Sequence, residues 1–197
     1  VEIKVIAGDI TKIETGAIVV NFFEETQHLD GDIAIIDKAL DGAISQLVSQ
    51  GEIKGKLNEI TIIHSLGKLP AARVVVTGLG KRQELSQDKI RGAVAETCRL
   101  LRQKGVDSIA TIAQGAGIGG INVDGAAQAV TEGALLGLYS FRRHITKEAE
   151  YGEIKQLTIV DVDEASLPGL IQGSDKGRIL AEATNLARDM TNEPANY

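Results

Sequence analysis

The stretch Ala17-Ile-Val-Val-Asn-Phe22 decides the fold class. Its apolar side chains follow one another without the polar alternation of a half-exposed strand, so the stretch predicts a strand buried on both faces. Such strands occur in parallel sheets that helices cover on both sides. The next segment fits this arrangement, because residues 32–50 repeat apolar side chains at spacings of three and four, and Gly51 suits the end of a helix.

The same alternation of short β-branched runs and longer helical patterns continues along the chain. We expect further strands over residues 3–7, 59–64, 73–77, 108–113 and 154–160, with the Gly67-Lys-Leu-Pro70 turn favouring a hairpin between the second and third of these. We expect further helices from the N-cap Ser86 to Lys104, from about Asp124 to Leu138, and from Asp175 to Met190. The last helix carries Ile179, Ala183, Leu186 and Met190 on one face.

Short connections between alternating strands and helices predict an α/β fold, a three-layer α/β/α sandwich with a mixed, mostly parallel sheet. The composition shifts over residues 161–174, which indicates a domain edge. We therefore expect an N-terminal α/β domain over residues 1–162, and a linker with a connecting helix over residues 163–197. Pro194 stops the last helix inside a specific-looking sequence, so we expect the natural polypeptide to continue beyond Tyr197.

Composition and charge narrow the range of functions. The chain has 197 residues and a net charge of −6, and this acidic balance offers no general attraction to nucleic acids or anionic membranes. No apolar stretch reaches the ~18 residues of a membrane-spanning helix, and the N-terminus lacks the pattern of a signal peptide. Cytoplasm is therefore the expected location. The single Cys98 lies in an amphipathic helical pattern and is expected to be a buried, inert thiol.

A glycine-rich loop, Gly115-Ala-Gly-Ile-Gly-Gly120, matches the spacing of dinucleotide-binding loops between a strand and a helix. The acidic residue that should follow about 20 residues later is missing, which argues against NAD. A loop for some phosphate or ribose ligand and a plain turn both remain open. Residues 78–81 lack the first glycine and the Ser or Thr of a nucleotide-binding P-loop.

No metal or nucleophile motif is complete. The three histidines have no metal-ligand spacing, and no serine lies in a G-x-S-x-G elbow. We expect Asp32 to cap the helix that it opens. The carboxylates Asp161, Asp163 and Glu164 are expected in a solvated acidic turn. A basic cluster is expected either in a solvated helix end or loop, or at an anion or partner site; it comprises Arg142, Arg143, His144 and Lys147.

Two stretches resemble the cytosolic leucine aminopeptidase family, namely Glu132 to Arg142 and, more specifically, Asn185 to Tyr197. Residues 76–81 are also similar to the N-terminal domain of that family. In the family, the last stretch joins this α/β domain to a C-terminal catalytic domain that holds two divalent metals, zinc or manganese. The resemblance implies a parent enzyme that is hexameric and releases N-terminal residues from peptides. No residue here matches the family's metal ligands, so catalytic and metal residues are expected to be absent, and the fragment is expected to serve as scaffold or oligomer interface.

The opening of the chain resembles macro domains, through Gly8-Asp-Ile-Thr11 followed by residues 17–21. The loop from Gln114 to Gly120 lies where their second phosphate-binding loop would be. The resemblance implies a crevice for ADP-ribose or another nucleotide, lined by Asp9, Ile10, Asn21, Gly115, Gly117, Gly119 and Gly120. However, Leu29-Asp-Gly-Asp-Ile33 replaces the first glycine-rich loop, and its carboxylates would repel a diphosphate.

The leading hypothesis is therefore a non-catalytic aminopeptidase domain whose partners are its own catalytic domain, other subunits and, through the catalytic domain, peptides. A macro-type ligand-binding module is the alternative. A structural or regulatory interface module is a third hypothesis. Membrane and nucleic-acid partners are not expected.

Overall fold

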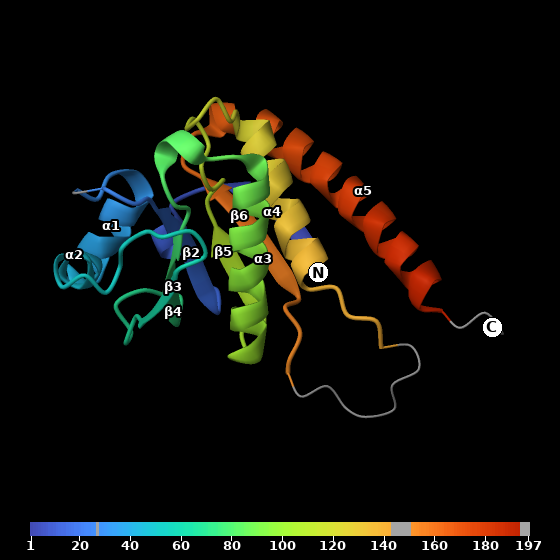
Figure 1. Cartoon of the computed structure of the whole chain (residues 1–197). Helices are drawn as coiled ribbons and strands as arrows, with labels where there is room; N and C mark the ends of the chain where they lie inside the picture. Colours follow the sequence, from blue (N-terminus) through green and yellow to red (C-terminus); the bar gives the residue numbers. More distant parts are fainter. Residues whose placement is uncertain (27, 143–150, 194–197) are drawn as a thin grey trace.

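The computed structural model describes residues 1–26, 28–142 and 151–193, which build a central sheet flanked by helices (Figure 1). Within these residues the sheet has six strands in the order β1-β6-β5-β2-β4-β3. Neighbouring strands run parallel, except that β3 pairs antiparallel with β4 as the expected hairpin. The strands are β1 (Glu2–Ala7), β2 (Ala17–Phe22), β3 (Ile60–His64), β4 (Arg73–Gly78), β5 (Ser108–Thr111) and β6 (Gln156–Asp161).

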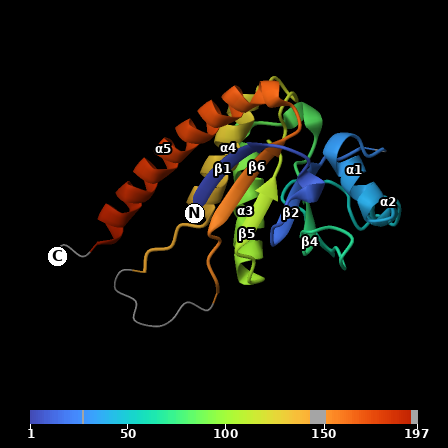
Figure 2. The ribbon, with the colours of Figure 1, turned by 180° about the vertical axis from the view of Figure 1, so that it is seen from behind.

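Helices cover both faces of the sheet, and α5 crosses α4 obliquely and extends beyond the sheet (Figures 1 and 2). The α-helices are α1 (Gly31–Ala39), α2 (Ala43–Ser49), α3 (Gln87–Gln103), α4 (Val123–Gly137) and α5 (Leu167–Asn192). Short 3-10 helices are η1 (Ile10–Lys12), η2 (Arg82–Glu84) and η3 (Glu164–Ser166). The expected three-layer α/β architecture with a mixed, mostly parallel sheet is confirmed.

Strand β2 lies near the middle of the sheet and is buried on both faces. Ala17 and Val19 belong to the core that packs under α3 and α4. Ile18, Val20 and Phe22 belong to the core under α1 and α2. This division follows from the alternation of side chains along a strand, and it explains why the stretch is apolar at nearly every position.

The single helix expected over residues 32–50 is wrong, because the chain breaks between α1 and α2. Asp41 and Gly42 adopt left-handed backbone conformations, with φ of 56° and 82°. The buried Asp37 stabilises the break, since its carboxylate accepts hydrogen bonds from the N–H groups of Ile44 (2.7 Å) and Ser45 (3.0 Å) and from the Ser45 hydroxyl. The side chain thus satisfies free N–H groups at the start of α2.

The last helix begins earlier than expected, at Leu167 instead of Asp175. Pro168 lies in its first turn, where the fixed backbone of proline is compatible with a helix. The first half of α5 packs closely on α4 through small residues. A Cβ atom added at Gly173 would lie 2.7 Å from the carbonyl carbon of Asp124, so only glycine permits this approach.

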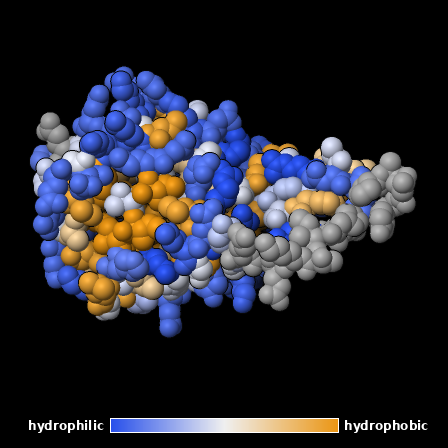
Figure 3. Space-filling model, turned by 60° about the horizontal axis from the view of Figure 1, so that its bottom comes forward, coloured by the Kyte–Doolittle hydropathy of each residue, from blue (hydrophilic) through white to orange (hydrophobic). Residues whose placement is uncertain are grey.

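The surface is not uniformly polar. Figure 3 shows apolar side chains gathered over a broad area of the face seen from below, on the side away from the residues drawn in grey. Among the helices that the structure describes, none combines the length and the apolar character needed to cross a membrane.

Candidate functional site

A crevice opens at the carboxyl edge of the sheet, where β2, β5 and β6 end. Its volume is about 280 Å³. The start of α1, the loop after β5 and Arg82 of η2 surround it. The lining residues are Asn21, Phe22, Phe23, Thr26, His28, Leu29, Asp30, Gly31, Asp32, Ile33, Arg82, Ile112, Ala113, Gly115, Ala116, Ile118, Val160 and Asp161. Ligand sites of open α/β sheets lie at this edge.

The crevice is rich in carboxylates. Asp30, Asp32 and Asp161 all line it. Burial raises the pKa of Asp32 above its ordinary value, and the charges of Asp161 and then Asp9 raise it further. The guanidinium of Arg82 lies 3.8 Å from the Asp30 carboxylate and 4.9 Å from the centre of the Phe23 ring, so it is already engaged within the protein.

Asp32 is not the helix cap that the sequence predicts. Asp30 occupies the N-cap position of α1 and makes no capping hydrogen bond through its side chain. Asp32 lies inside the first turn and lines the crevice. Asp161, expected in a solvated turn, ends β6 and reaches the same crevice.

The structure brings only some of the predicted crevice residues together. Asn21 and Gly115 line the cavity, whereas Asp9, Ile10, Gly117, Gly119 and Gly120 are not among its lining residues. The carboxylate of Asp9 accepts hydrogen bonds from the N–H (2.9 Å) and hydroxyl (2.6 Å) of Thr11, and these bonds hold its pKa below the ordinary value. Ile10 is buried in the core under α1 and α2.

The glycine-rich loop closes on itself. The N–H of Gly117 donates to the carbonyl of Ile121 (2.8 Å), and the N–H of Ile118 donates to the carbonyl of Gly115 (3.2 Å). Gly115 has a φ of 77°, and a Cβ added there would lie 2.9 Å from a methyl group of Leu85. The turn and the tight packing therefore both require glycine at this position, independently of any phosphate.

Other chemical candidates are inert or lie elsewhere. Cys98 lies on α3 and is buried in the core that includes residues of the sheet, and burial raises the pKa of its thiol to about 12. Within the described residues, no three His, Cys, Asp or Glu side chains form a group that could hold a metal ion. In the basic cluster, Arg143, His144 and Lys147 lie outside the described residues, so its role stays a prediction.

A second candidate site is formed by the far half of α5. Its side chains fasten the helix to the end of α4: Asn185 and Arg188 donate to the carbonyls of Leu135 and Leu136, both at 3.2 Å. These carbonyls belong to the last turn of α4, where carbonyl groups have no N–H partner within the helix. The stretches of residues 132–142 and 185–193, far apart in the sequence, therefore meet in space.

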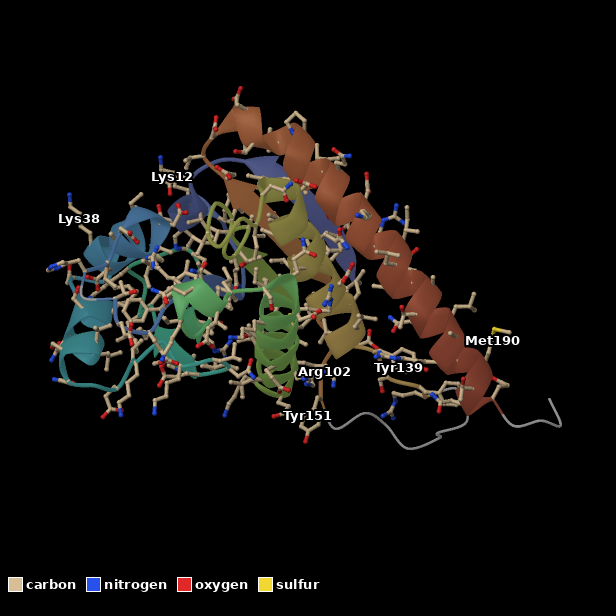
Figure 4. All side chains as sticks on the ribbon, turned by 45° about the horizontal axis from the view of Figure 1, so that its top comes forward. Lys12, Lys38, Arg102, Tyr139, Tyr151 and Met190 are labelled. Carbon is tan, nitrogen blue, oxygen red and sulfur yellow. The ribbon has the colours of Figure 1, made fainter. Side chains whose placement is uncertain are left out.

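The same contact continues around Tyr139. Its hydroxyl donates to Asp189 (2.8 Å) and accepts from Asn192 (3.2 Å), and the Arg188 guanidinium lies 5.3 Å from its ring centre. Figure 4 shows Tyr139 beside the last turns of α5, and Met190 on the outer side of the helix.

The outer face of α5 carries an exposed apolar stripe, which we define as Ile179, Ala183, Leu186 and Met190. Ile179 and Leu186 are each 60% exposed and Met190 is 72% exposed. The opposite face is buried and consists of Leu170, Gly173, Ser174, Gly177 and Ala181. Beside the stripe, a groove of about 620 Å³ lies between residues 140–142 and the end of α5.

Comparison with known proteins gives one consistent family. A sequence model described as "Cytosol aminopeptidase family, N-terminal domain" matches residues 19–148. A probable cytosol aminopeptidase of Alkaliphilus oremlandii is 33% identical over 196 residues, which cover 99% of this chain and 39% of the relative. The chain therefore spans about two fifths of the length of the curated relatives that it matches.

Solved structures agree on the fold. A mutant of tomato leucine aminopeptidase superposes with a TM-score of 0.78 at 16% identity, covering 100% of this chain and 39% of that one. A macrodomain of Trypanosoma brucei in complex with ADP-ribose gives a TM-score of 0.66 at 18% identity, covering 86% of this chain and 67% of that one. These likenesses confirm the macro-domain-like fold. Together with the sequence match, they show that the chain belongs to the cytosol aminopeptidase family and corresponds to its N-terminal domain.

Proposed function

We propose that this chain is the non-catalytic N-terminal domain of a two-metal leucyl aminopeptidase that releases N-terminal residues from peptides. Residues 1–162 form the domain in this proposal, and residues 163–197 connect it to a C-terminal catalytic domain. The chain serves there as scaffold and oligomer interface. Membership of the family supports the proposal, as does the fraction of the relatives' length that the chain spans.

The observation that carries the scaffold role is the two-sided character of α5. One face is fixed to α4 by close packing and by the side-chain bonds of Asn185 and Arg188. The other face exposes Ile179, Leu186 and Met190. Burying each of these side chains in an interface would stabilise that interface by about 1–2 kcal/mol, which is less than for a fully exposed side chain because each is already partly buried. The helix thus offers a rigid apolar surface close to the end of the described chain.

The remaining parts of the proposal concern the complete protein. In this proposal the C-terminal domain holds two divalent metals, zinc or manganese, as the resemblance to the aminopeptidase family implies. When bound there, the metals supply an activated water and polarise the peptide carbonyl. The complete protein is proposed to be a cytoplasmic hexamer, in line with the word "cytosol" in the names of its relatives.

The experiment compares this chain with the complete polypeptide on leucine p-nitroanilide, with manganese or zinc added. The complete polypeptide is expected to release p-nitroaniline in a metal-dependent way, and the pure chain is expected to release none. Metal-dependent turnover by the pure chain would overturn the non-catalytic assignment. An inactive but folded and metal-loaded complete polypeptide would overturn the peptidase assignment.

A second candidate function is binding of ADP-ribose or another nucleotide in the crevice. It is favoured by the position of the cavity at the carboxyl edge of a sheet that superposes on a macrodomain in complex with ADP-ribose. Titration calorimetry with ADP-ribose tests it directly. Binding that is lost in Asn21→Ala, a change in the crevice lining, supports this function, and the absence of heat at millimolar ADP-ribose rejects it.

A further inference from the structure

We propose that the crevice at the carboxyl edge of β2, β5 and β6 binds a small molecule that carries a protonated amine on an apolar skeleton. The proposal names a ligand class for the crevice of the second candidate function and rests on that crevice being a binding site. It is independent of the peptidase assignment.

The position and size of the cavity indicate a compact ligand. After β2 the chain turns toward β4 and β3, and after β5 it crosses through α4 to β6, so the crevice lies where the connections diverge to opposite sides of the sheet. This is the point at which open α/β sheets hold ligands. The volume of about 280 Å³ lies just below the usual range of small-molecule pockets, which is ~300–1,000 Å³, so the ligand must be small.

The charges in the lining select for a cation. Asp32 and Asp161 both line the cavity. Within the described residues neither carboxylate makes an ion pair with a lysine or arginine, although Oδ1 of Asp161 accepts a hydrogen bond from the N–H of Asp163 (2.9 Å). Arg82 is the one lysine or arginine of the lining, all of which lies in the described part of the chain, and it is held by Asp30 and the Phe23 ring. A diphosphate would therefore meet unpaired negative charge, whereas an ammonium group would relieve the repulsion between the carboxylates.

The rest of the lining suits an apolar skeleton. Half of the lining residues are aliphatic or aromatic, and they come from the strand ends, the start of α1 and the loop after β5: Phe22, Phe23, Leu29, Ile33, Ile112, Ala113, Ala116, Ile118 and Val160. Pockets that combine apolar walls with a few charged groups fix the orientation of a ligand through those groups. An amine held by Asp32 and Asp161 would place its hydrocarbon part against these walls.

The test is a titration of the uniformly ¹⁵N-labelled chain at pH 7.5, followed by amide chemical shifts. The probes are 3-methylbutylamine, its neutral isostere 3-methylbutan-1-ol, and ADP-ribose. We expect saturable shifts around Gly31 and Ala116 with the amine, and binding of the alcohol that is weaker by about tenfold or more, because it lacks the charged hydrogen bond.

Variants identify the groups responsible. Asp32→Asn and Asp161→Asn are each expected to weaken amine binding about tenfold or more. The matched control is Asp107→Asn, because Asp107 precedes β5 and so lies at the amino edge of the sheet, and an asparagine can still accept the hydrogen bond of Ser108. The amide spectrum of each variant shows directly whether it is folded.

The outcomes separate the proposals. Amine binding that depends on Asp32 and Asp161 supports the inference. Equal binding of the alcohol, or no effect of either folded variant, overturns it. Binding of ADP-ribose in the crevice without amine binding overturns the inference and retains the second candidate function. Absence of shifts with all three probes overturns both, and none of these results bears on the peptidase assignment.

Discussion

Replacing Gly173 by alanine is expected to destabilise the chain, although alanine favours helices. The added Cβ would overlap the Asp124 carbonyl group and lie 2.7 Å from its carbon, whereas ordinary contacts between carbon atoms are ~3.5–4.0 Å. Helices α4 and α5 would have to separate by about 1 Å. Overpacking of this severity costs about 3 kcal/mol, and the better helix propensity of alanine returns about 1 kcal/mol. The net loss is about 2 kcal/mol.

Gly169→Ala is the matched control, since Gly169 lies one turn earlier in the same helix. A Cβ there would lie 3.7 Å from Val123, an ordinary contact, so this change is expected to stabilise the chain by up to about 1 kcal/mol. Thermal unfolding followed by circular dichroism measures both. For a chain of this size, we expect Tm to fall by about 4–8 °C in Gly173→Ala and to rise by about 2–4 °C in Gly169→Ala. Equal or higher stability of Gly173→Ala would refute the close α4–α5 packing.

Two further predictions concern aspartates. Because the pKa of Asp32 is raised in the folded chain, the folded state binds its proton more tightly, and ionised Asp32 opposes folding above that raised pKa. Asp32→Asn should therefore be more stable than the parent at pH 7 by up to about 1 kcal/mol, and this difference should vanish below pH 3.8. Urea unfolding at several pH values measures the difference, and a variant that is less stable than the parent at pH 7 would contradict the prediction. Asp37→Ala should lose about 2–3 kcal/mol in urea unfolding, because two N–H groups at the start of α2, that of Ile44 buried and that of Ser45 partly buried, lose their acceptor. Asp37→Asn should lose less, and an alanine variant as stable as the parent would disprove the cap.

Much of the fold could be predicted from the sequence, because buried parallel strands leave a strong pattern. The apolar run of residues 17–22 predicts the central strand, and the turn before Arg73 indicates the hairpin. The division of α1 from α2 was missed because apolar spacings continue across the break at Asp41 and Gly42. The sequence pattern begins the last helix at Asp175, later than the observed Leu167, although Pro168 is typical of the first turn of a helix.

The sites were less accessible to sequence reasoning. Asp32, Arg82 and Asp161 are far apart in the chain, and only the parallel order of the strands brings them to one edge. The stripe on α5 was visible as a spacing, but spacing does not tell which face is buried. In the structure, Gly173 and Gly177 are buried against α4, because close packing of two helices needs small side chains. The large side chains of Ile179, Leu186 and Met190 lie on the exposed face.

The proposed role of α5 as an interface is tested most directly by the reactivity of a thiol placed in its exposed apolar stripe. Leu186→Cys is labelled with a maleimide in this chain alone and in the complete polypeptide, and Glu96→Cys on the exposed side of α3 serves as the control. Peptide mass spectrometry separates these positions from other cysteines, and the buried Cys98 does not compete. We expect labelling of residue 186 to slow by roughly tenfold or more in the complete polypeptide, since the thiol must be exposed to react, while residue 96 is unaffected. Equally fast labelling of residue 186 in both proteins would contradict the docking surface.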